Sequence, residues 1–455
     1  IIDSLRRSGY QFITLEQYLG MDRKTLMPPI EKGKAYYAMR SNLFLAELIY
    51  HMSDFLTALF LVFLGLGTLR LLFMYVLMVR EKRAENRRHY PPIDPATAPL
   101  VSIIVPAYNE EVNIVRTIKT LKQQDYPNMH IYFVDDGSKD HTLERVREAF
   151  GDDREVTILS KPNGGKASAL NYGVEACISE YVVCIDADTQ LKNDAVRRLM
   201  NHFIADKEKR VGAVAGNVKV GNQRNLLTYW QAIEYTSSQN FDRMAYSNIN
   251  AVTVVPGAIG AFRKAVIQEV GGFTTDTLAE DCDLTMSINE HGYIIENENY
   301  AVALTEAPET LRQFVKQRIR WSFGVMQAFW KHRSALFAPS KGGFGLWAMP
   351  NMLIFQYIIP TFSPIADVLM IIGLFTGNVV QILSYYALFL VIDASVSIMA
   401  YIFERERLWV LILVIPQRFF YRWIMYYVLF KSYLKAIKGE LQTWGVLKRT
   451  GNVGK

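Results

Sequence analysis

The stretch VSIIVPAYNE, residues 101–110, decides the fold of this 455-residue chain. It has the pattern of a short buried strand that ends in polar residues. Similar apolar runs follow at 131–134, 156–159 and 181–185. Segments with helical character separate them, around 110–123, 140–150 and 166–178. Strands that alternate with helices predict an α/β fold with a parallel sheet, whose ligand site lies at the carboxyl ends of the strands.

Three of these strands end in polar motifs: YNE (108–110), DDGS (135–138) and DAD (186–188). Carboxylates at one edge of a sheet can accept hydrogen bonds from a base or from ribose hydroxyls. Asp186 and Asp188 can also offer oxygen ligands to Mg²⁺ or Mn²⁺, and such a cation neutralises charge on a diphosphate. Each motif alone is also typical of a turn or a solvated loop.

Three further motifs lie downstream. NGGK (163–166) precedes a predicted helix, so its glycines allow a phosphate to approach the backbone and its lysine can reach that phosphate. LAEDCD (278–283) precedes another helix and places Asp281 near a helix N-terminus, which favours an ionised carboxylate. QRIRW (317–321) lies on a predicted basic, amphipathic helix at 309–331, of the kind that lies on a membrane surface. A glycine turn, a helix cap and a core-facing helix are the ordinary alternatives.

An apolar run precedes these motifs. The 25 residues from Phe55 to Val79 contain one charge, Arg70, and predict a transmembrane helix at 53–80. A basic stretch at 80–88 follows, which puts that end in the cytoplasm and residues 1–50 outside.

Three apolar runs follow the motifs, at 347–375, 379–403 and 408–430. They predict a membrane domain of two to three transmembrane helices at 345–435, with an uncharged outer link at 376–378 and a tail at 436–455. The last run contains Arg418 and Arg422, so it either crosses the membrane or lies in the interface.

Composition excludes several classes of protein. Hydrophobic residues make up 50% of the chain, charged residues 21%, and the net charge is +6, which excludes a disordered chain and argues against a purely soluble or a purely membrane-buried protein. Three cysteines without a CxxC pair indicate reduced thiols in a cytoplasmic compartment rather than a disulfide scaffold. The seven histidines show no zinc-site spacing.

The ordered set PAYNE, DDGS, NGGK, DAD, AED and QRIRW resembles the processive family 2 glycosyltransferases, which include cellulose, chitin, hyaluronan and poly-N-acetylglucosamine synthases. The resemblance covers about residues 99–335 and the layout of the flanking helices. It implies a GT-A type nucleotide-sugar-binding domain at 98–337, inserted between transmembrane α-helices. VPGAIGAFR (255–263) and PETL (308–311) are similar to bacterial poly-N-acetylglucosamine synthases. Ala279 departs from the pattern, because many relatives have Thr there.

The resemblance implies a role for each matching residue. Asp281 is the general base of an inverting transfer. The nucleotide sugar is held by Tyr108, Glu110, Asp135, Asp136, Lys166, Asp186, Gln317 and Arg320. The metal ion, Mg²⁺ or Mn²⁺, is held by Asp186 and Asp188. The acceptor is held by Glu280, Trp321 and Gly257.

The resemblance also implies partners: UDP-N-acetylglucosamine as donor, the growing polysaccharide as acceptor and the lipid bilayer. It leaves room for a small membrane partner subunit and implies no nucleic acid. Residues 1–30 resemble the last helix and strand of an extracytoplasmic polysaccharide deacetylase domain, which favours an N-acetylated polymer. We expect poly-β-1,6-N-acetylglucosamine, translocated across the inner membrane in biofilm formation. A chitin-type β-1,4 polymer, hyaluronan, cellulose, single-sugar transfer to a lipid phosphate, and a catalytically silent export channel or nucleotide-sugar sensor are the alternatives.

Overall fold

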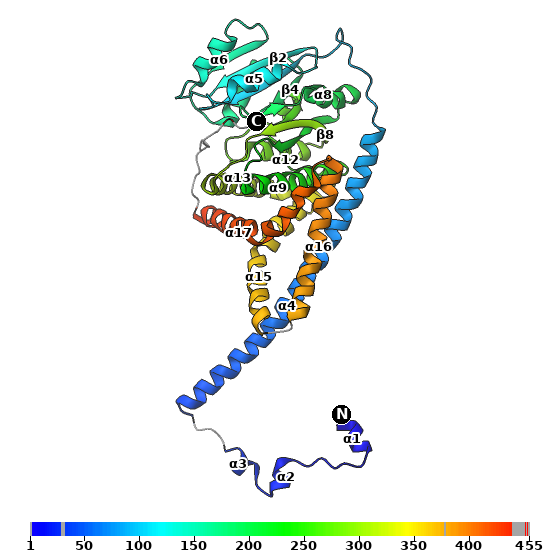
Figure 1. Cartoon of the computed structure of the whole chain (residues 1–455), viewed down its shortest axis with the longest axis vertical. Helices are drawn as coiled ribbons and strands as arrows, with labels where there is room; N and C mark the ends of the chain where they lie inside the picture. The colour runs from blue at the N-terminus through cyan, green and yellow to red at the C-terminus, as the bar shows by residue number, and fades with distance from the viewer. Residues whose placement is uncertain (1, 29–31, 377–378, 439–450, 452, 454–455) are drawn as a thin grey trace. The chain divides into compact units, whose positions relative to one another are not determined.

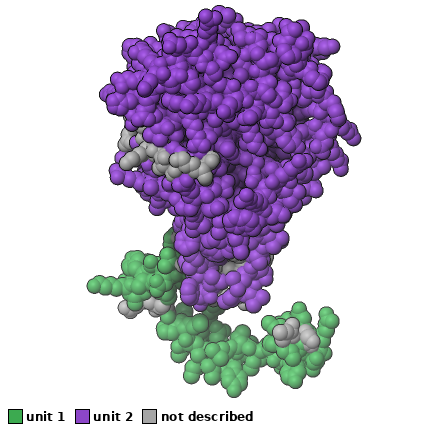
Figure 2. Space-filling view, turned by 45° about the horizontal axis from the view of Figure 1, so that its top comes forward, with its two compact units in different colours: residues 1–66 green, residues 67–455 purple. Residues whose placement is uncertain are grey.

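The computed structural model describes residues 2–28, 32–376, 379–438, 451 and 453. The chain divides into two compact units, residues 1–66 and residues 67–455 (Figure 2). The predicted link at 376–378 and most of the predicted tail at 436–455 lie outside the described residues.

The second unit is built on an eight-stranded sheet of order β3-β2-β1-β4-β7-β6-β8-β5 (Figure 1). The strands are β1 Val101–Ala107, β2 Met129–Asp135, β3 Val156–Ser160, β4 Tyr181–Cys184, β5 Gln190–Leu191, β6 Val211–Val220, β7 Gly260–Arg263 and β8 Ile294–Thr305. The first four strands are parallel, as predicted. The sheet as a whole is mixed, because β7 runs antiparallel to β4 and β6, and β5 runs antiparallel to β8.

The strands form because both faces of the sheet are covered by helices. Every residue of β1 is buried, and its side chains alternate between two apolar layers. Ile104 packs with Leu170 on one face, and Ile103 packs with Ile118 on the other. The covering helices of this half are α5 Ile114–Lys122, α6 Thr142–Phe150 and α7 Lys166–Ala176. The predicted segments are therefore confirmed to within a few residues.

The second half of the sheet carries more helices: α8 Ala195–Ala205, α9 Leu226–Glu234, the π-helical turn η1 Tyr235–Asn240, α10 Phe241–Ser247, α11 Lys264–Glu269, α12 Glu280–Glu290 and α13 Leu311–Lys331. The helix predicted at 309–331 is thus present as α13. Its Arg318 does not lie on an exposed basic face, because the guanidinium is buried and pairs with Glu234 at 2.9 Å.

Long apolar helices precede and follow the sheet domain along the chain. They are α4 Lys34–Arg87, a run of short helical turns from Phe344 to Ile358, α15 Ile359–Thr376, α16 Val379–Glu404, the 3₁₀ turn η6 Leu408–Leu413 and α17 Val414–Lys438. Among the described residues, three helical stretches are long and apolar enough to cross a membrane: Leu61–Arg87, Phe344–Ile372 and Leu408–Lys438. Within the second unit, α17 lies across the base of α13, steeply inclined to α15 and α16 (Figure 1).

Helix α4 is longer than the span predicted at 53–80. Its basic end also contacts the sheet domain, because Arg88 pairs with Glu296 of β8 at 3.4 Å and Lys82 donates to the Tyr300 hydroxyl at 3.0 Å. Part of the predicted cytoplasmic cluster therefore binds the protein itself.

The first unit begins with three short helices, α1 Ile2–Arg7, α2 Leu15–Leu19 and α3 Arg23–Leu26. Helix α1 lies in the segment 1–30, for which the sequence predicts a helix and a strand. The predicted strand is not found among the described residues 2–28, where Tyr10 is 65% exposed. A strand needs a neighbour that completes its backbone hydrogen bonds, and these residues have none.

Candidate active site

The loops after β1 and β2 hold each other through side chain to backbone hydrogen bonds. The Asn109 amide donates to Ser138 Oγ at 3.0 Å, and Asn109 Oδ1 accepts from the Lys139 amide at 2.8 Å. The Glu110 amide donates to Thr142 Oγ1 at 2.8 Å. Asn109 has a φ of +57°, a conformation that asparagine tolerates well. These contacts hold Tyr108 and Glu110 at the carboxyl edge of the sheet, where both are partly exposed.

Asp135 and Asp136 are buried at the end of β2 and anchor the NGGK loop. The Asp136 carboxylate accepts from Lys161 Nζ at 2.7 Å and from the backbone amides of Gly164 and Gly165 at 3.0 and 2.7 Å. Asp135 Oδ2 accepts a hydrogen bond from Ser160 Oγ at 3.2 Å. The sequence reasoning missed Lys161, although its place two residues before the NGGK motif is a usable signal.

The strongest cluster of charges joins NGGK, DAD and AED. Lys166 Nζ lies 2.6 Å from Asp186 Oδ1 and 3.0 Å from Glu280 Oε1. The Gly257 amide donates to Asp281 Oδ2 at 3.2 Å. Residues from four separate segments therefore converge at one point, as the motif order predicts for the carboxyl edge of the sheet.

Gly257 lies at the centre of this cluster. A Cβ atom placed there would lie 2.5 Å from Lys166 Nζ, and 3.6 Å from carboxylate oxygens of both Asp186 and Asp281. Any side chain at this position would push the lysine away from its carboxylates. The structure thus supplies a steric reason for glycine in the VPGAIGAFR segment.

Asp281 lies in the first turn of α12 and is partly exposed. Burial among packed groups and the nearby negative charge of Glu280 raise its pKa to about 6, although Lys166 opposes the shift. The carboxylates of Asp186, Glu280 and Asp281 raise the pKa of Lys166, although burial of the ammonium group acts in the opposite direction. Such a carboxylate is ionised near neutral pH and is more basic than a free one, as a general base requires.

Helix α13 packs directly against the segment that precedes Asp281. A Cβ atom on Gly324 would lie 2.7 Å from the backbone nitrogen of Ala279, so only glycine allows this approach. Gln327 Oε1 accepts from the Leu278 amide at 3.1 Å. Ala279 sits under this contact and is buried. The QRIRW helix and the AED motif are therefore held together as one structural unit.

The QRIRW side chains take different positions on α13. Gln317 is buried, and its Oε1 atom has no hydrogen-bond partner in the part of the chain that the structure describes. Trp321 is partly buried, tilts against Tyr235 with ring centroids 6.3 Å apart and is covered by the Arg318 guanidinium at 4.5 Å. Arg320 is partly exposed. A buried amide oxygen without a partner is uncommon, so Gln317 is a candidate ligand-binding group on α13.

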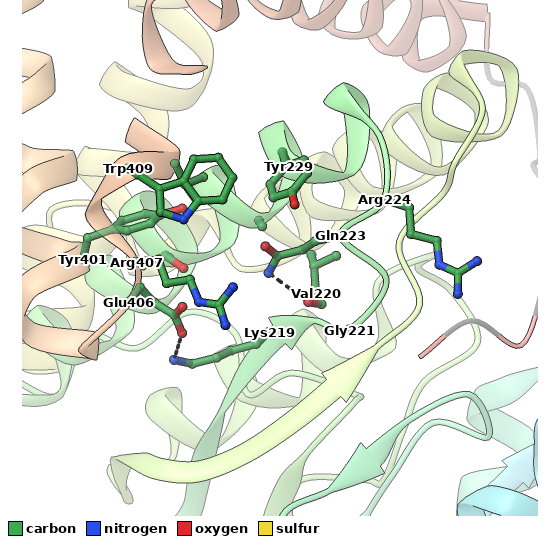
Figure 3. Close-up of a pocket in the computed structure, with 13 residues that line it drawn as sticks. Lys219, Val220, Gly221, Gln223, Arg224, Tyr229, Tyr401, Glu406, Arg407 and Trp409 are labelled. Carbon is green, nitrogen blue, oxygen red and sulfur yellow. Dashed lines mark hydrogen bonds and ion pairs between the residues drawn. The ribbon is translucent and has the colours of Figure 1, made fainter. Parts of the chain in front are cut away.

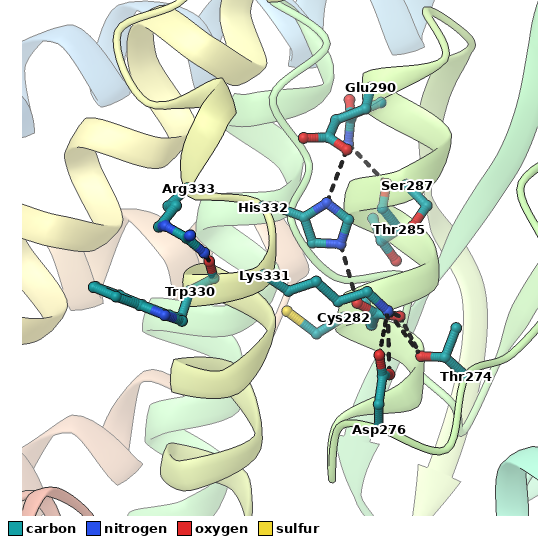
Figure 4. Close-up of polar contacts among 12 residues, drawn as sticks. Thr274, Asp276, Cys282, Thr285, Ser287, Glu290, Trp330, Lys331, His332 and Arg333 are labelled. Atoms are coloured by element: carbon teal, nitrogen blue, oxygen red, sulfur yellow. Dashed lines mark hydrogen bonds and ion pairs between the residues drawn. The ribbon is translucent and has the colours of Figure 1, made fainter. Parts of the chain in front are cut away.

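A second charged cluster joins α12 to the end of α13 and was not predicted. Figure 4 shows His332 beside Glu290, and Lys331 beside Thr274 and Asp276. Asp283 is fully buried and accepts from His332 Nε2 at 3.0 Å and from Lys331 Nζ at 2.9 Å. His332 Nδ1 lies 2.9 Å from Glu290 Oε2. The only sequence signals are the second aspartate of AEDCD and the KHR triplet (331–333) that ends α13. This cluster fixes the end of α13 to α12.

Asp188 is buried, and its Oδ1 atom accepts from Thr189 Oγ1 at 3.4 Å. Cys177, Cys184 and Cys282 are free and buried, as predicted. Burial raises the pKa of the Cys282 thiol well above its usual value, so this thiol is not activated as a nucleophile.

Known proteins resemble this chain over the same region. Residues 98–324 match a family model described as glycosyltransferase like family 2. A poly-beta-1,6-N-acetyl-D-glucosamine synthase of Staphylococcus epidermidis is 32% identical over 235 residues, which are 50% of this chain and 56% of that protein. The synthase of that name from Staphylococcus aureus is 31% identical over 224 residues, or 49% of this chain and 54% of its own.

The chain thus spans only about half the length of these curated relatives. Among solved structures, the mannosyltransferase PcManGT from Pyrobaculum calidifontis, in complex with GDP-Man and Mn²⁺, aligns with a TM-score of 0.56 and 22% identity, over 81% of this chain and 96% of its own. That likeness establishes the GT-A fold. Residues 98–324 of this chain are therefore a family 2 glycosyltransferase domain.

Proposed function

We propose that this chain is a membrane-embedded, processive, inverting glycosyltransferase that polymerises N-acetylglucosamine from UDP-N-acetylglucosamine. The product that we favour is poly-β-1,6-N-acetylglucosamine, because relatives at about 31% identity carry that name. One observation carries the proposal: Asp281 lies beside Lys166, Asp186 and Glu280, directly under the helix that carries QRIRW.

The proposed reaction uses the raised basicity of Asp281. Its carboxylate takes the proton of the acceptor hydroxyl while that oxygen attacks C1 of the donor sugar, and the C1–O bond to UDP breaks with its electron pair on the leaving oxygen. General-base assistance of this kind is worth about 10²–10⁴-fold in rate. Gln317 and Arg320 would hold the diphosphate, and Trp321 offers a flat surface to the terminal sugar of the polymer.

The carboxylates fit a Mg²⁺ or Mn²⁺ ion that is bound together with the donor. Among the described residues, no group of three or more His, Cys, Asp or Glu side chains could hold a metal alone. Asp186 and Asp188 can supply two oxygen ligands, and Mg²⁺ typically binds through one or two carboxylates plus substrate phosphates and water. Such an ion stabilises the negative charge on the departing diphosphate. With Asp186 bound to the ion, Lys166 would keep its ion pair with Glu280 and orient that carboxylate.

Polar groups between the long helices support export of the polymer by the same chain. A cavity of about 350 Å³ is lined by residues of α4, η1, α10, α16 and α17. Arg70 and Asp242 line it and pair at 3.0 Å, and Arg418 lines it from α17. Ionisable residues inside apolar helices are costly, and they commonly mark a path for polar substrates.

The position of α17 bears on the alternatives for the last apolar run. It lies beside α13 (Figure 1). The Tyr421 hydroxyl donates a hydrogen bond to Glu234, which also pairs with the buried Arg318. We therefore favour an interfacial α17, which keeps the basic end of the helix on the cytoplasmic side and satisfies the positive-inside rule.

The test is UDP release by the purified, detergent-solubilised protein given UDP-N-acetylglucosamine with Mg²⁺ or Mn²⁺. Asp281→Asn should lower the rate of release by about 10²–10⁴-fold and leave donor binding intact. Asp152→Asn, on an exposed loop, should leave both unchanged. Hydrolases specific for β-1,6 or β-1,4 linkages then identify the polymer. Binding without release in the unaltered protein would favour a nucleotide-sugar sensor, and release only with another UDP-sugar would overturn the choice of donor.

A further inference from the structure

A cavity of about 460 Å³ lies between the glycosyltransferase domain and the end of α16, and none of the predicted site residues lines it (Figure 3). Its walls come from the end of β6, from α9 and η1, and from the segment 401–410. Three cationic residues, Lys219, Arg224 and Arg407, line it against one carboxylate, Glu406. The cavity is therefore cationic.

The three cationic side chains of the cavity differ in whether a carboxylate of the protein already pairs with them. Lys219 Nζ pairs with Glu406 and, at 3.1 Å, with Glu404. Arg224 and Arg407 have no acidic partner in the described part of the chain. In Figure 3 the guanidinium of Arg407 points into the space beside Lys219 and Gln223, while Arg224 lies at the outer edge. Two unneutralised guanidinium groups at one cavity favour an anion with several oxygens, such as a phosphate.

Aromatic residues form the other wall. The rings of Tyr229 and Trp409 meet edge to face with centroids 5.8 Å apart, and Trp409 is 57% exposed. Directly beyond Trp409, Ile412 and Ile415 are 69% and 56% exposed at the start of the stretch Leu408–Lys438, which is apolar enough to enter a membrane. Tryptophan, tyrosine and arginine beside exposed apolar residues are typical of the level of lipid headgroups.

We propose that this cavity binds a phosphate group through Arg407, with Arg224 at its rim, and that the phosphate belongs to the headgroup of an anionic phospholipid. Basic pockets beside membrane helices on the cytoplasmic side are suited to such headgroups. A soluble phosphate ester would offer the same chemistry, but the exposed apolar residues beside the cavity favour a ligand with acyl chains. The cavity lies beside the contact between α9 and η6, where Trp230 Nε1 donates to the Leu413 carbonyl at 3.0 Å. A bound lipid would therefore stabilise the contact between the glycosyltransferase domain and η6.

The experiment measures binding of phosphatidylglycerol to the full chain in phosphatidylcholine nanodiscs, through the change in tryptophan fluorescence and through lipids retained in native mass spectra. The double variant Arg224→Gln/Arg407→Gln should weaken retention about tenfold or more, and Arg407→Lys should weaken it less because the charge remains. Arg154→Gln is the matched control, because it makes the same substitution at an exposed arginine that does not line the cavity. Circular dichroism confirms that each variant is folded.

A parallel titration with inorganic pyrophosphate in pure phosphatidylcholine separates the two sources. Retention of phosphatidylglycerol that only the pocket variants lose supports the headgroup. Saturable pyrophosphate binding that the pocket variants lose, without lipid retention, would overturn the lipid and leave a soluble phosphate ester. Equal binding by the double variant and the unaltered protein would overturn the site. No readout needs sugar transfer, so these outcomes are independent of the proposed polymerase activity.

Discussion

Asp281 and Asp283 lie two residues apart on α12, yet their surroundings are opposite. Asp281 faces Glu280 and accepts backbone amides, and its pKa is raised to about 6 by burial and by that like charge. Burial acts on Asp283 in the same direction, but hydrogen bonds from His332, Thr274 and Lys331 outweigh it and lower its pKa to about 2. Two carboxylates with pKa values pushed apart mark different roles. On the proposed mechanism, Asp281 is kept basic to accept a proton, whereas Asp283 is held ionised by its hydrogen bonds to α13 and its end.

The largest expected effect is on turnover, and it belongs to Asp281. The Asp281→Asn variant should lower kcat by about 10²–10⁴-fold, because the amide cannot accept a proton. Its melting temperature should not fall, because the change also removes repulsion from Glu280. Initial rates and thermal unfolding in the same detergent test both statements. An active Asp281→Asn enzyme would mean that another group is the base.

The mirror variant is Asp283→Asn, which should act mainly on stability. It leaves His332 and Lys331 without their shared carboxylate, and breaking a buried ion pair costs about 3–5 kcal/mol. We expect the lower end of that range, because the Lys331 side chain is 33% exposed and keeps Asp276 at 3.0 Å. Urea unfolding measures the loss. A stability equal to that of the unaltered protein would contradict the structural role of Asp283.

The reaction rate should also depend on the close backbone approach at Gly257, beside Asp281. Gly257→Ala places a methyl group 2.5 Å from Lys166 Nζ, so the ammonium group must shift away from its contacts with Asp186 and Glu280. A displacement of about 1 Å at a catalytic centre can lower the rate about 10²-fold. The melting temperature should change little, because the lysine side chain can move. Gly271→Ala, at a position with open space and a φ of +91°, is the control for strain without displacement.

The raised pKa of Asp281 predicts the acid limb of the rate profile. Below about pH 6 the base becomes protonated, so kcat/KM should fall about tenfold for each further pH unit. The fall should come before any unfolding due to Asp283, whose pKa is about 2. UDP release measured from about pH 5 to 8, with donor binding measured alongside, separates the two. A flat profile down to pH 5 would show that Asp281 is not the titrating base.

The first half of the fold and most of the site were predictable because their signals are local. Each parallel strand is an apolar run that ends in a polar motif, and parallel strands bring those ends to one edge. That geometry is enough to place Asp136, Asp186 and Lys166 near one another. The pairing of β6 with β8 and the antiparallel β7 carry no such signal, because they join residues far apart in sequence.

The cluster around Asp283 was missed for a related reason. Its partners lie 48 and 49 residues away, on a different helix. In the sequence, Lys331 and His332 are only charged residues at a helix end, a position where cations are common for reasons of the helix dipole. Motif reasoning finds residues that chemistry requires at fixed spacing. It does not find charges that hold two helices in register.

The smallest expected effect is the pH dependence of the stabilisation by His332, which tests the difference between Asp281 and Asp283. Burial alone would lower the pKa of His332, but hydrogen bonds to Asp283 and Glu290 raise it to about 9. A raised pKa in the folded state means that this stabilisation is complete below the unfolded value of about 6.5 and is lost as the pH rises through about 9. His332→Gln should therefore cost about 1–3 kcal/mol at pH 6 and much less above pH 9. Lys331 also donates to Asp283, and its hydrogen bonds to Asp283 and Asp276 raise its pKa although burial opposes them, so it remains charged over that range. Unfolding of both proteins at the two pH values measures the difference. A cost that does not change with pH would mean that His332 acts by packing alone, and that only Asp281 on α12 owes its role to a shifted charge.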